Sequence, residues 1–301
     1  MTTPRLTPAE SETTGMRFDV HGFSVSITVP DARARDTVAR VFGAFGAAGG
    51  GEHHAATPPT RYTLFRDAQQ WSVSADGTTY YTDAAFADAL NALEWHIVTA
   101  MLALRRDLFH LHGASLRAPS GESTTLVLGE SGSGKTTLTL GLIARGFLPY
   151  ADDVTLIEPA TLLPQTFRRA FHIDDRTRAI IEALAPTRRW NFDAAPPGYF
   201  VPPQWAESPA PIRTVLFPRL RPHEAPRLDP LPVAEAVVAL LPFSLTLAND
   251  PALALPVAAR IAEQARCFRL STGDLDATAR MIAALVEETP VSVPDRPEGR
   301  R

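Results

Sequence analysis

The feature that most constrains the fold of this chain is a glycine-rich segment at residues 129–136. It reads Gly-Glu-Ser-Gly-Ser-Gly-Lys-Thr and fits the pattern G-x-x-x-x-G-K-[ST]. The apolar and β-branched run 124–128 before it predicts a buried strand. After it, Leu138, Leu142 and Ile143 recur at helical spacing, and Gly146 is placed to end the helix. We therefore expect a strand, a tight loop and a helix over 136–145.

A loop of this kind is suited to holding phosphate. The helix N-terminus presents backbone N–H groups and the positive end of the helix dipole. Lys135 adds a full positive charge, and the hydroxyl of Thr136 is a group that can ligate Mg²⁺. The pattern predicts binding of a nucleoside triphosphate, ATP, together with Mg²⁺. The residues expected to contact the nucleotide are Gly129, Ser131, Gly132, Ser133, Gly134, Lys135, Thr136 and Thr137.

Composition excludes several kinds of partner and site for this chain. The 29 Lys and Arg against 33 Asp and Glu give a net charge of −4, which supplies no global attraction to nucleic acid or to an anionic membrane. A single cysteine, Cys267, excludes an internal disulfide and a cysteine-based zinc site. No apolar run approaches bilayer length, and residues 1–15 are too polar for a signal peptide. We expect a cytoplasmic protein with neither a nucleic-acid nor a membrane partner.

The first part of the chain is expected to form a small domain. Residues 1–14 are rich in Thr, Pro and Glu and predict a disordered arm. Residues 15–88 predict an α+β domain: alternating apolar residues over 18–29 indicate strands around a turn at Gly22, and residues 32–45 indicate a helix. Asp76-Gly77, between two runs rich in β-branched and aromatic residues, predicts a hairpin.

Residues 89–288 are expected to form a second, larger domain. A long amphipathic helix is predicted over 85–108, followed by one strand over 109–116 that pairs with the strand entering the glycine loop. Further strands are expected at 147–151, 154–157, 212–217 and 267–270, and helices at 233–241, 254–263 and 274–286. The Pro-rich stretch 186–211 indicates a surface lid or partner-binding segment, and residues 289–301 a flexible tail.

Asp152-Asp153 is the second informative site. The pair ends a predicted strand only a short distance after Lys135, and we expect this strand to neighbour the one that enters the glycine loop. One carboxylate there can hold Mg²⁺ across from Thr136, and the other can orient or deprotonate an attacking hydroxyl.

These segments together resemble the catalytic core of HPr kinase/phosphorylase. That family has an H-G pair, a G-x-S-G-x-G-K-S loop and an R-G-H-x-L-V-A-D-D segment. The matching residues here are His112-Gly113, residues 129–137, Ala144-Arg-Gly146 and Ala151-Asp-Asp-Val154. The resemblance covers 109–158, while 212–218 and 268–275 resemble the broader group of HPr-kinase-related proteins, which often lie beside peptide-modification genes. ATP-type phosphoenolpyruvate carboxykinases share the loop and the Asp pair more distantly.

The resemblance implies an α/β fold: a P-loop kinase core of the HPr kinase/phosphoenolpyruvate carboxykinase type, joined here to a small N-terminal α+β domain. It also implies roles for single residues. Lys135 would bind the β- and γ-phosphates, Thr136 would ligate Mg²⁺, and Asp153 would be the second metal-side group. Asp152 would be the general base on a substrate hydroxyl, with His112 on an adjacent strand close enough to tune it.

Arg168 and Arg169 follow the Asp pair and could clamp the γ-phosphate or an acidic substrate; solvated surface arginines are the alternative. The implied activity is an ATP- and Mg²⁺-dependent kinase that phosphorylates a Ser or Thr hydroxyl of a peptide or small protein, a precursor peptide being one candidate. A small-molecule kinase would use the same machinery, and a non-catalytic ATP-binding regulatory module would not need Asp152. Formation of a homo-oligomer is left open.

Overall fold

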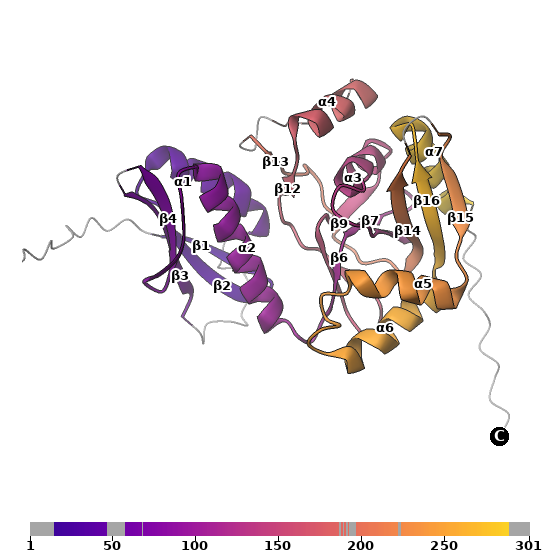
Figure 1. Ribbon diagram of the computed structural model, residues 1–301, viewed down its shortest axis with the longest axis horizontal. Helices are drawn as coiled ribbons and strands as arrows, with labels where there is room; N and C mark the ends of the chain where they lie inside the picture. Colours follow the sequence, from indigo (N-terminus) through magenta and orange to yellow (C-terminus); the bar gives the residue numbers. More distant parts are fainter. Residues whose placement is uncertain are drawn as a thin grey trace, which may run out of the picture. The chain divides into compact units, whose positions relative to one another are not determined.

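The computed structural model describes residues 15–46, 58–67, 69–186, 188, 190, 192, 197–221 and 224–288. The arm predicted at 1–14 and the tail predicted at 289–301 lie outside these residues. The chain divides into two compact units, and their boundary in the described chain falls between Arg105 and Arg106 (Figure 1). Both units mix helices with β-sheet, so the expectation of a mixed α/β protein is confirmed. None of the described helices is both long and apolar enough to cross a membrane.

The first unit is built on a 5-stranded sheet in the order β1-β2-β3-β4-β5. Its strands are β1 (Met16–Val20), β2 (Phe23–Thr28), β3 (Thr60–Asp67), β4 (Gln70–Ala75) and β5 (Thr78–Asp83). Strands β2 and β3 run parallel, and the other neighbours are antiparallel. The turns at His21-Gly22 and Asp76-Gly77 have positive φ at both residues, which suits the twist of a tight hairpin. The turns predicted at both places are confirmed.

Two helices cover one face of this sheet, α1 (Ala32–Phe42) and α2 (Phe86–Leu104); a short 3₁₀ turn, η1 (Gly43–Phe45), follows α1. Phe42 of α1 packs on Phe18 of β1. His96 of α2 shares a hydrogen bond of 3.0 Å with the Tyr62 hydroxyl and stacks on Tyr80. Because α2 packs on these strands, it belongs to the first unit. The boundary therefore follows Arg105, rather than lying between residues 88 and 89.

The second unit is built on a 6-stranded sheet in the order β15-β16-β14-β8-β7-β9. Its strands are β7 (Ala114–Arg117), β8 (Thr124–Val127), β9 (Leu148–Ala151), β14 (Ile212–Leu220), β15 (Arg227–Pro230) and β16 (Arg266–Thr272). Strands β8, β14 and β16 run parallel to one another. Strand β7 is antiparallel to both β8 and β9 and lies between them. The expectation that β9 directly neighbours β8 is therefore wrong.

The single strand predicted over 109–116 is divided at Gly113. Strand β6 (Phe109–His112) pairs with β10 (Val154–Ile157) in a 3-stranded sheet with β11 (Pro164–Gln165), whereas β7 pairs with β8. A Cβ on Gly113 would lie 2.6 Å from the main-chain oxygen of Val127 and from Leu128 Cδ2. Only glycine allows the chain to pass this close to β8 while it changes sheets. The prediction missed this break because Leu111, Ala114 and Leu116 read as one apolar run.

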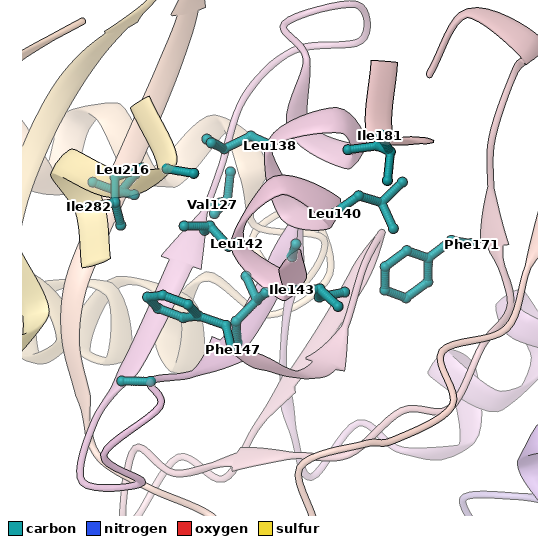
Figure 2. Close-up of a cluster of buried hydrophobic side chains, with 14 of the residues drawn as sticks. Val127, Leu138, Leu140, Leu142, Ile143, Phe147, Phe171, Ile181, Leu216 and Ile282 are labelled. Atoms are coloured by element: carbon teal, nitrogen blue, oxygen red, sulfur yellow. The ribbon is translucent and has the colours of Figure 1, made fainter. Parts of the chain in front are cut away.

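Helices lie on both sides of the large sheet (Figure 1). They are α3 (Lys135–Ala144), α4 (Asp175–Leu184), α5 (Val233–Leu240), α6 (Pro251–Gln264) and α7 (Leu275–Glu287), with a 3₁₀ turn η3 (Leu241–Phe243) after α5. One core cluster joins α3, α4 and α7, and includes Leu216 of β14 with Ile282 of α7 (Figure 2). Another joins α5 and α6 with Val215 and Phe217 of β14. The strands thus bury both faces, which explains their nearly continuous apolar runs.

The region between β10 and β14 holds elements that the sequence did not predict. Besides α4, there is a two-stranded ladder of β12 (Phe171–His172) and β13 (Tyr199–Phe200). Phe200 of this ladder is buried in the same core cluster as Ile181 of α4. Trp190 and Phe192, from the segment between α4 and β13, are buried in that cluster as well. These rings anchor the described part of the stretch 186–211 to the core, while residues 203–204 and 207–209 are exposed. A role as a surface lid or partner-binding segment stays a prediction.

Candidate functional site

The strand and helix predicted on either side of the glycine loop are confirmed. Strand β8 ends at Val127, and α3 begins at Lys135, with Gly134 preceding its first turn. Gly132 and Gly134 have φ of 78° and 86°, which glycine adopts without strain. Nothing lies within 4 Å of where a Cβ on either residue would be, so the loop is open around them. Arg145 ends the helix and Gly146 follows with φ of 92°, as the sequence predicted.

Lys135 folds back over the loop. Its Nζ donates to the main-chain oxygens of Gly129, at 2.6 Å, and Glu130, at 3.1 Å. Partial burial lowers the pKa of Lys135, and the negative charges of Asp153 and Asp152 oppose this shift. The ammonium group therefore lies within the field of both carboxylates, at the N-terminus of α3.

The loop meets the Asp pair through Thr136. Its Oγ1 donates to Asp152 Oδ2 at 3.2 Å. Asp152 is buried, and burial raises its pKa to about 7; repulsion from Asp153 adds to the rise, while Thr136, Arg169 and Lys135 counter it. The other oxygen, Oδ1, is buried and has no hydrogen-bond partner among the described residues. A buried carboxylate with one oxygen unsatisfied is suited to receive a cation or a proton.

Asp153 lies in a different environment from its neighbour. Its Oδ2 accepts from Arg169 Nη1 at 2.8 Å, and its Oδ1 is 3.4 Å from His112 Nδ1. His112 is placed by the β6–β10 ladder, in which it pairs with Val154, and by the bond from Gly113 N to Asp153 O. The structure therefore brings His112 against Asp153. The expectation that His112 lies close enough to tune Asp152 is not what the contacts show.

The two arginines after the Asp pair separate. Arg169 is buried and bridges Asp153 to His172, with Nη2 3.3 Å from His172 Nε2. Arg168 points elsewhere: its guanidinium is half-exposed and lies 3.5 Å from Glu207. Only Arg169 of the predicted clamp therefore joins the candidate site. Sequence reasoning did not single out His172, which lies in β12 against Arg169. The one sequence signal for it is its place three residues after Arg169, in the run Arg-Arg-Ala-Phe-His.

The remaining predicted loop residues are less involved in the side-chain contacts. Thr137 Oγ1 lies 3.2 Å from Thr177 Oγ1 and so joins α3 to the first turn of α4. Asp174, which caps that turn by accepting from Thr177 N at 2.7 Å, was the sequence signal for the helix that the prediction missed. Ser131 is exposed at the tip of the loop, whereas Ser133 Oγ is buried inside it.

The residues present fit both a triphosphate and Mg²⁺. The open glycine loop, the α3 N-terminus and Lys135 match the requirements of an anion. The Thr136 hydroxyl and the carboxylates of the Asp pair are hard oxygen ligands of the kind that Mg²⁺ takes. Within the described ranges, no three His, Cys, Asp or Glu side chains gather into a metal-binding group. A Mg²⁺ ion at Thr136 would therefore take its remaining ligands from phosphate oxygens and water, as it does in many nucleotide sites.

Comparisons with known proteins do not establish a family. No protein-family model matches the chain, and no curated protein matches it either. Among solved structures, it is similar to the Hpr(Ser) kinase/phosphatase from Coxiella burnetii, with a TM-score of 0.31 and 15% identity. This match covers 59% of the present chain and 88% of that chain. A similarity at this level establishes neither common descent nor a shared activity.

Proposed function

We propose that this protein is an ATP- and Mg²⁺-dependent kinase, with an HPr-kinase-like core, that transfers the γ-phosphoryl group to a Ser or Thr hydroxyl of a peptide or small protein. The observation that carries the proposal is the hydrogen bond from Thr136 to Asp152. It joins a loop suited to a triphosphate to a pair of carboxylates suited to metal and proton chemistry. A module that only bound nucleotide would not need a general base beside the metal-side carboxylate.

On the donor side, Lys135 binds the β- and γ-phosphates once its ammonium leaves the two loop oxygens. The α3 N-terminus and the loop N–H groups hold the phosphate chain in place. Mg²⁺, when bound by Thr136 and a carboxylate of the Asp pair, would neutralise charge on the phosphate oxygens. Because the transferring group is already highly charged, positioning and charge neutralisation account for most of the rate.

On the acceptor side, Asp152 acts as the general base. Its raised pKa, about 7, places it where a carboxylate can still accept a proton at neutral pH. The acceptor oxygen attacks the γ-phosphorus, its proton passes to Asp152, and the bond from the γ-phosphorus to the bridging oxygen breaks to release ADP. Asp153, held by Arg169 and His112, lies on the metal side.

The contact with Thr136 also favours the opposite assignment, in which Asp152 serves the metal and Asp153 the acceptor. The variants Asp152→Asn and Asp153→Asn separate the two. The base is the residue whose amide variant keeps Mg²⁺-dependent ATP affinity and loses transfer. The metal-side residue is the one whose variant loses the Mg²⁺ dependence of ATP binding. Lys135→Ala should weaken nucleotide binding under either assignment and serves as the binding control.

The reaction itself is tested by mass spectrometry of candidate peptides after incubation with Mg-ATP. Gain of one phosphate on a hydroxyl residue, lost in Asp152→Asn and retained in Arg168→Ala, is the expected result. Arg168 is the matched control because it lies in the same segment yet contacts Glu207. Phosphorylation of a metabolite and of no peptide would turn the proposal to a small-molecule kinase. Nucleotide binding without turnover of any acceptor would indicate a regulatory module.

A further inference from the structure

Strand β14 extends past the point where β8 becomes the glycine loop. The two strands are parallel, with Leu216 opposite Val127, so residues 218–220 continue beside the loop. Pro218 touches it: Pro218 Cγ lies 3.4 Å from where a Cβ on Gly129 would be. The end of β14 therefore forms one wall of the loop's surroundings.

The last residue of this strand, Leu220, is apolar and 51% exposed. Side chains alternate along a strand, and Leu216 belongs to the core shared with α3 and α7 (Figure 2). Pro218 and Leu220 therefore face the side of the sheet on which α3 starts, whereas Phe217 faces α5 and α6. The structure thus presents an exposed leucine beside the loop, on the same side as the helix N-terminus.

This strand end is rigidly held by β16. Leu220 pairs with Thr272, whose Oγ1 donates to Arg219 O at 3.2 Å, and Arg221 N donates to Thr272 O at 2.8 Å. A Cβ on Gly273 would lie 1.8 Å from Glu224 O, so the backbone after β14 packs directly on the backbone after β16. We call residues 218–221 the ledge. Its backbone is fixed before any ligand arrives, which lowers the entropic cost of binding.

The direction of a bound nucleotide follows from the strand order. The Asp pair follows β9, which lies on one side of β8 beyond β7, and β14 lies on the other side. The γ-phosphate belongs near Thr136 and the Asp pair, so the nucleoside end of the molecule leaves the loop in the direction of β14. Ligands of parallel sheets bind at the carboxyl ends of the strands, where the ledge stands.

We propose that the ledge is the base-binding surface of the nucleotide site, with Leu220 packing against a purine while the buried Pro218 supports the ledge beside the loop. This inference rests on the proposed function, because it takes the phosphate end to be at the Asp pair. The contact is apolar and supplies affinity for the base alone. The triphosphate is bound by the loop and Lys135, so the two parts of the ligand have separate determinants.

The test compares two probes, Mg-ATP and magnesium tripolyphosphate, by calorimetry on the full chain. Leu220→Ser should weaken Mg-ATP about tenfold, which is the scale of losing one buried leucine contact, and leave tripolyphosphate unchanged. Leu220→Met should restore the affinity for Mg-ATP. Leu255→Ser is the matched control, because Leu255 is also exposed but lies on α6, on the opposite side of the sheet.

Three results would overturn the inference while leaving the kinase proposal intact: equal weakening of both probes by Leu220→Ser, no weakening of either, or wild-type affinity for Mg-ATP no greater than for tripolyphosphate. Failure of the wild-type chain to bind either probe would instead remove the proposed function, and the base-binding surface with it. A tripolyphosphate affinity that is unchanged also shows that the Leu220→Ser variant has kept the loop folded.

Discussion

Asp152→Asn should make the second unit more stable while it abolishes phosphoryl transfer. Asp152 is buried, and burial with the repulsion of Asp153 raises its pKa from 3.8 to about 7. The folded state therefore holds a proton more tightly than the unfolded state does. With respect to this carboxyl, the free energy of unfolding is highest below pH 4, and it falls as the pH rises through about 7. An amide has no such charge to bury.

The size of the effect follows from the shift. A difference of about three pKa units corresponds to about 4 kcal/mol of unfolding free energy at a pH above the folded pKa. Relaxation of the protein around the buried charge of Asp152 reduces this figure. We expect Asp152→Asn to exceed the wild type by about 2–4 kcal/mol at pH 8, with the difference vanishing near pH 4.

The assay is urea unfolding in metal-free buffer between pH 4 and pH 8. Replacing Trp71 and Trp95 of the first unit by Phe leaves Trp190 and Trp205 to report on the second. The absence of Mg²⁺ matters, because a cation at Asp152 would itself lower its pKa. The difference in midpoint between variant and wild type, multiplied by the slope, gives the change in unfolding free energy at each pH.

Asp153→Asn is the matched control, since it removes a charge from the adjacent residue. Asp153 pairs with the buried guanidinium of Arg169, so its loss should lower stability at pH 8 rather than raise it. An Asp152→Asn variant no more stable than the wild type at pH 8 would show that the buried charge of Asp152 does not destabilise the fold. A difference between the two that does not shrink from pH 8 to pH 4 would contradict the raised pKa of Asp152 as its cause.

Three further outcomes are expected. Gly113→Ala should lower the unfolding free energy by roughly 2–3 kcal/mol in thermal or urea melts, because the new Cβ overlaps Val127 O; an unchanged melt would contradict that packing. Tyr62→Phe should cost about 1 kcal/mol, since it removes the bond to His96, and a circular dichroism melt would measure it. A fragment of residues 15–105 should fold alone and melt cooperatively, whereas one ending at residue 88 should not, because it lacks α2.

Much of the fold could be predicted from local pattern. The hairpins at Gly22 and at Asp76-Gly77, the helix after the glycine loop, and α5, α6 and α7 follow from turn residues and from helical or alternating periodicity. Helix α4 was missed although Asp174 offers an N-cap. The domain boundary was misplaced because the apolar face of α2 does not say on which sheet it packs.

In the candidate site too, part could be predicted from local sequence and part could not. The order of residues 129–136 predicts a loop and a helix start without reference to the rest of the chain, because glycine conformations and helix capping are local. The roles of Arg168 and Arg169 could not be separated by sequence, since the two residues are adjacent and of the same type. The β12 strand and the ion pair with Asp153 decide between them.

By itself, the sequence determined the glycine loop, its flanking strand and helix, and the presence of two adjacent carboxylates downstream. Only the tertiary structure decided that β7 lies between β8 and β9, and that Gly113 passes the chain from one sheet to another. It also set Asp152 against Thr136 and Asp153 against Arg169 and His112. The physical reason is that burial and charge pairing depend on which strands meet, and strand pairing joins residues far apart in the chain.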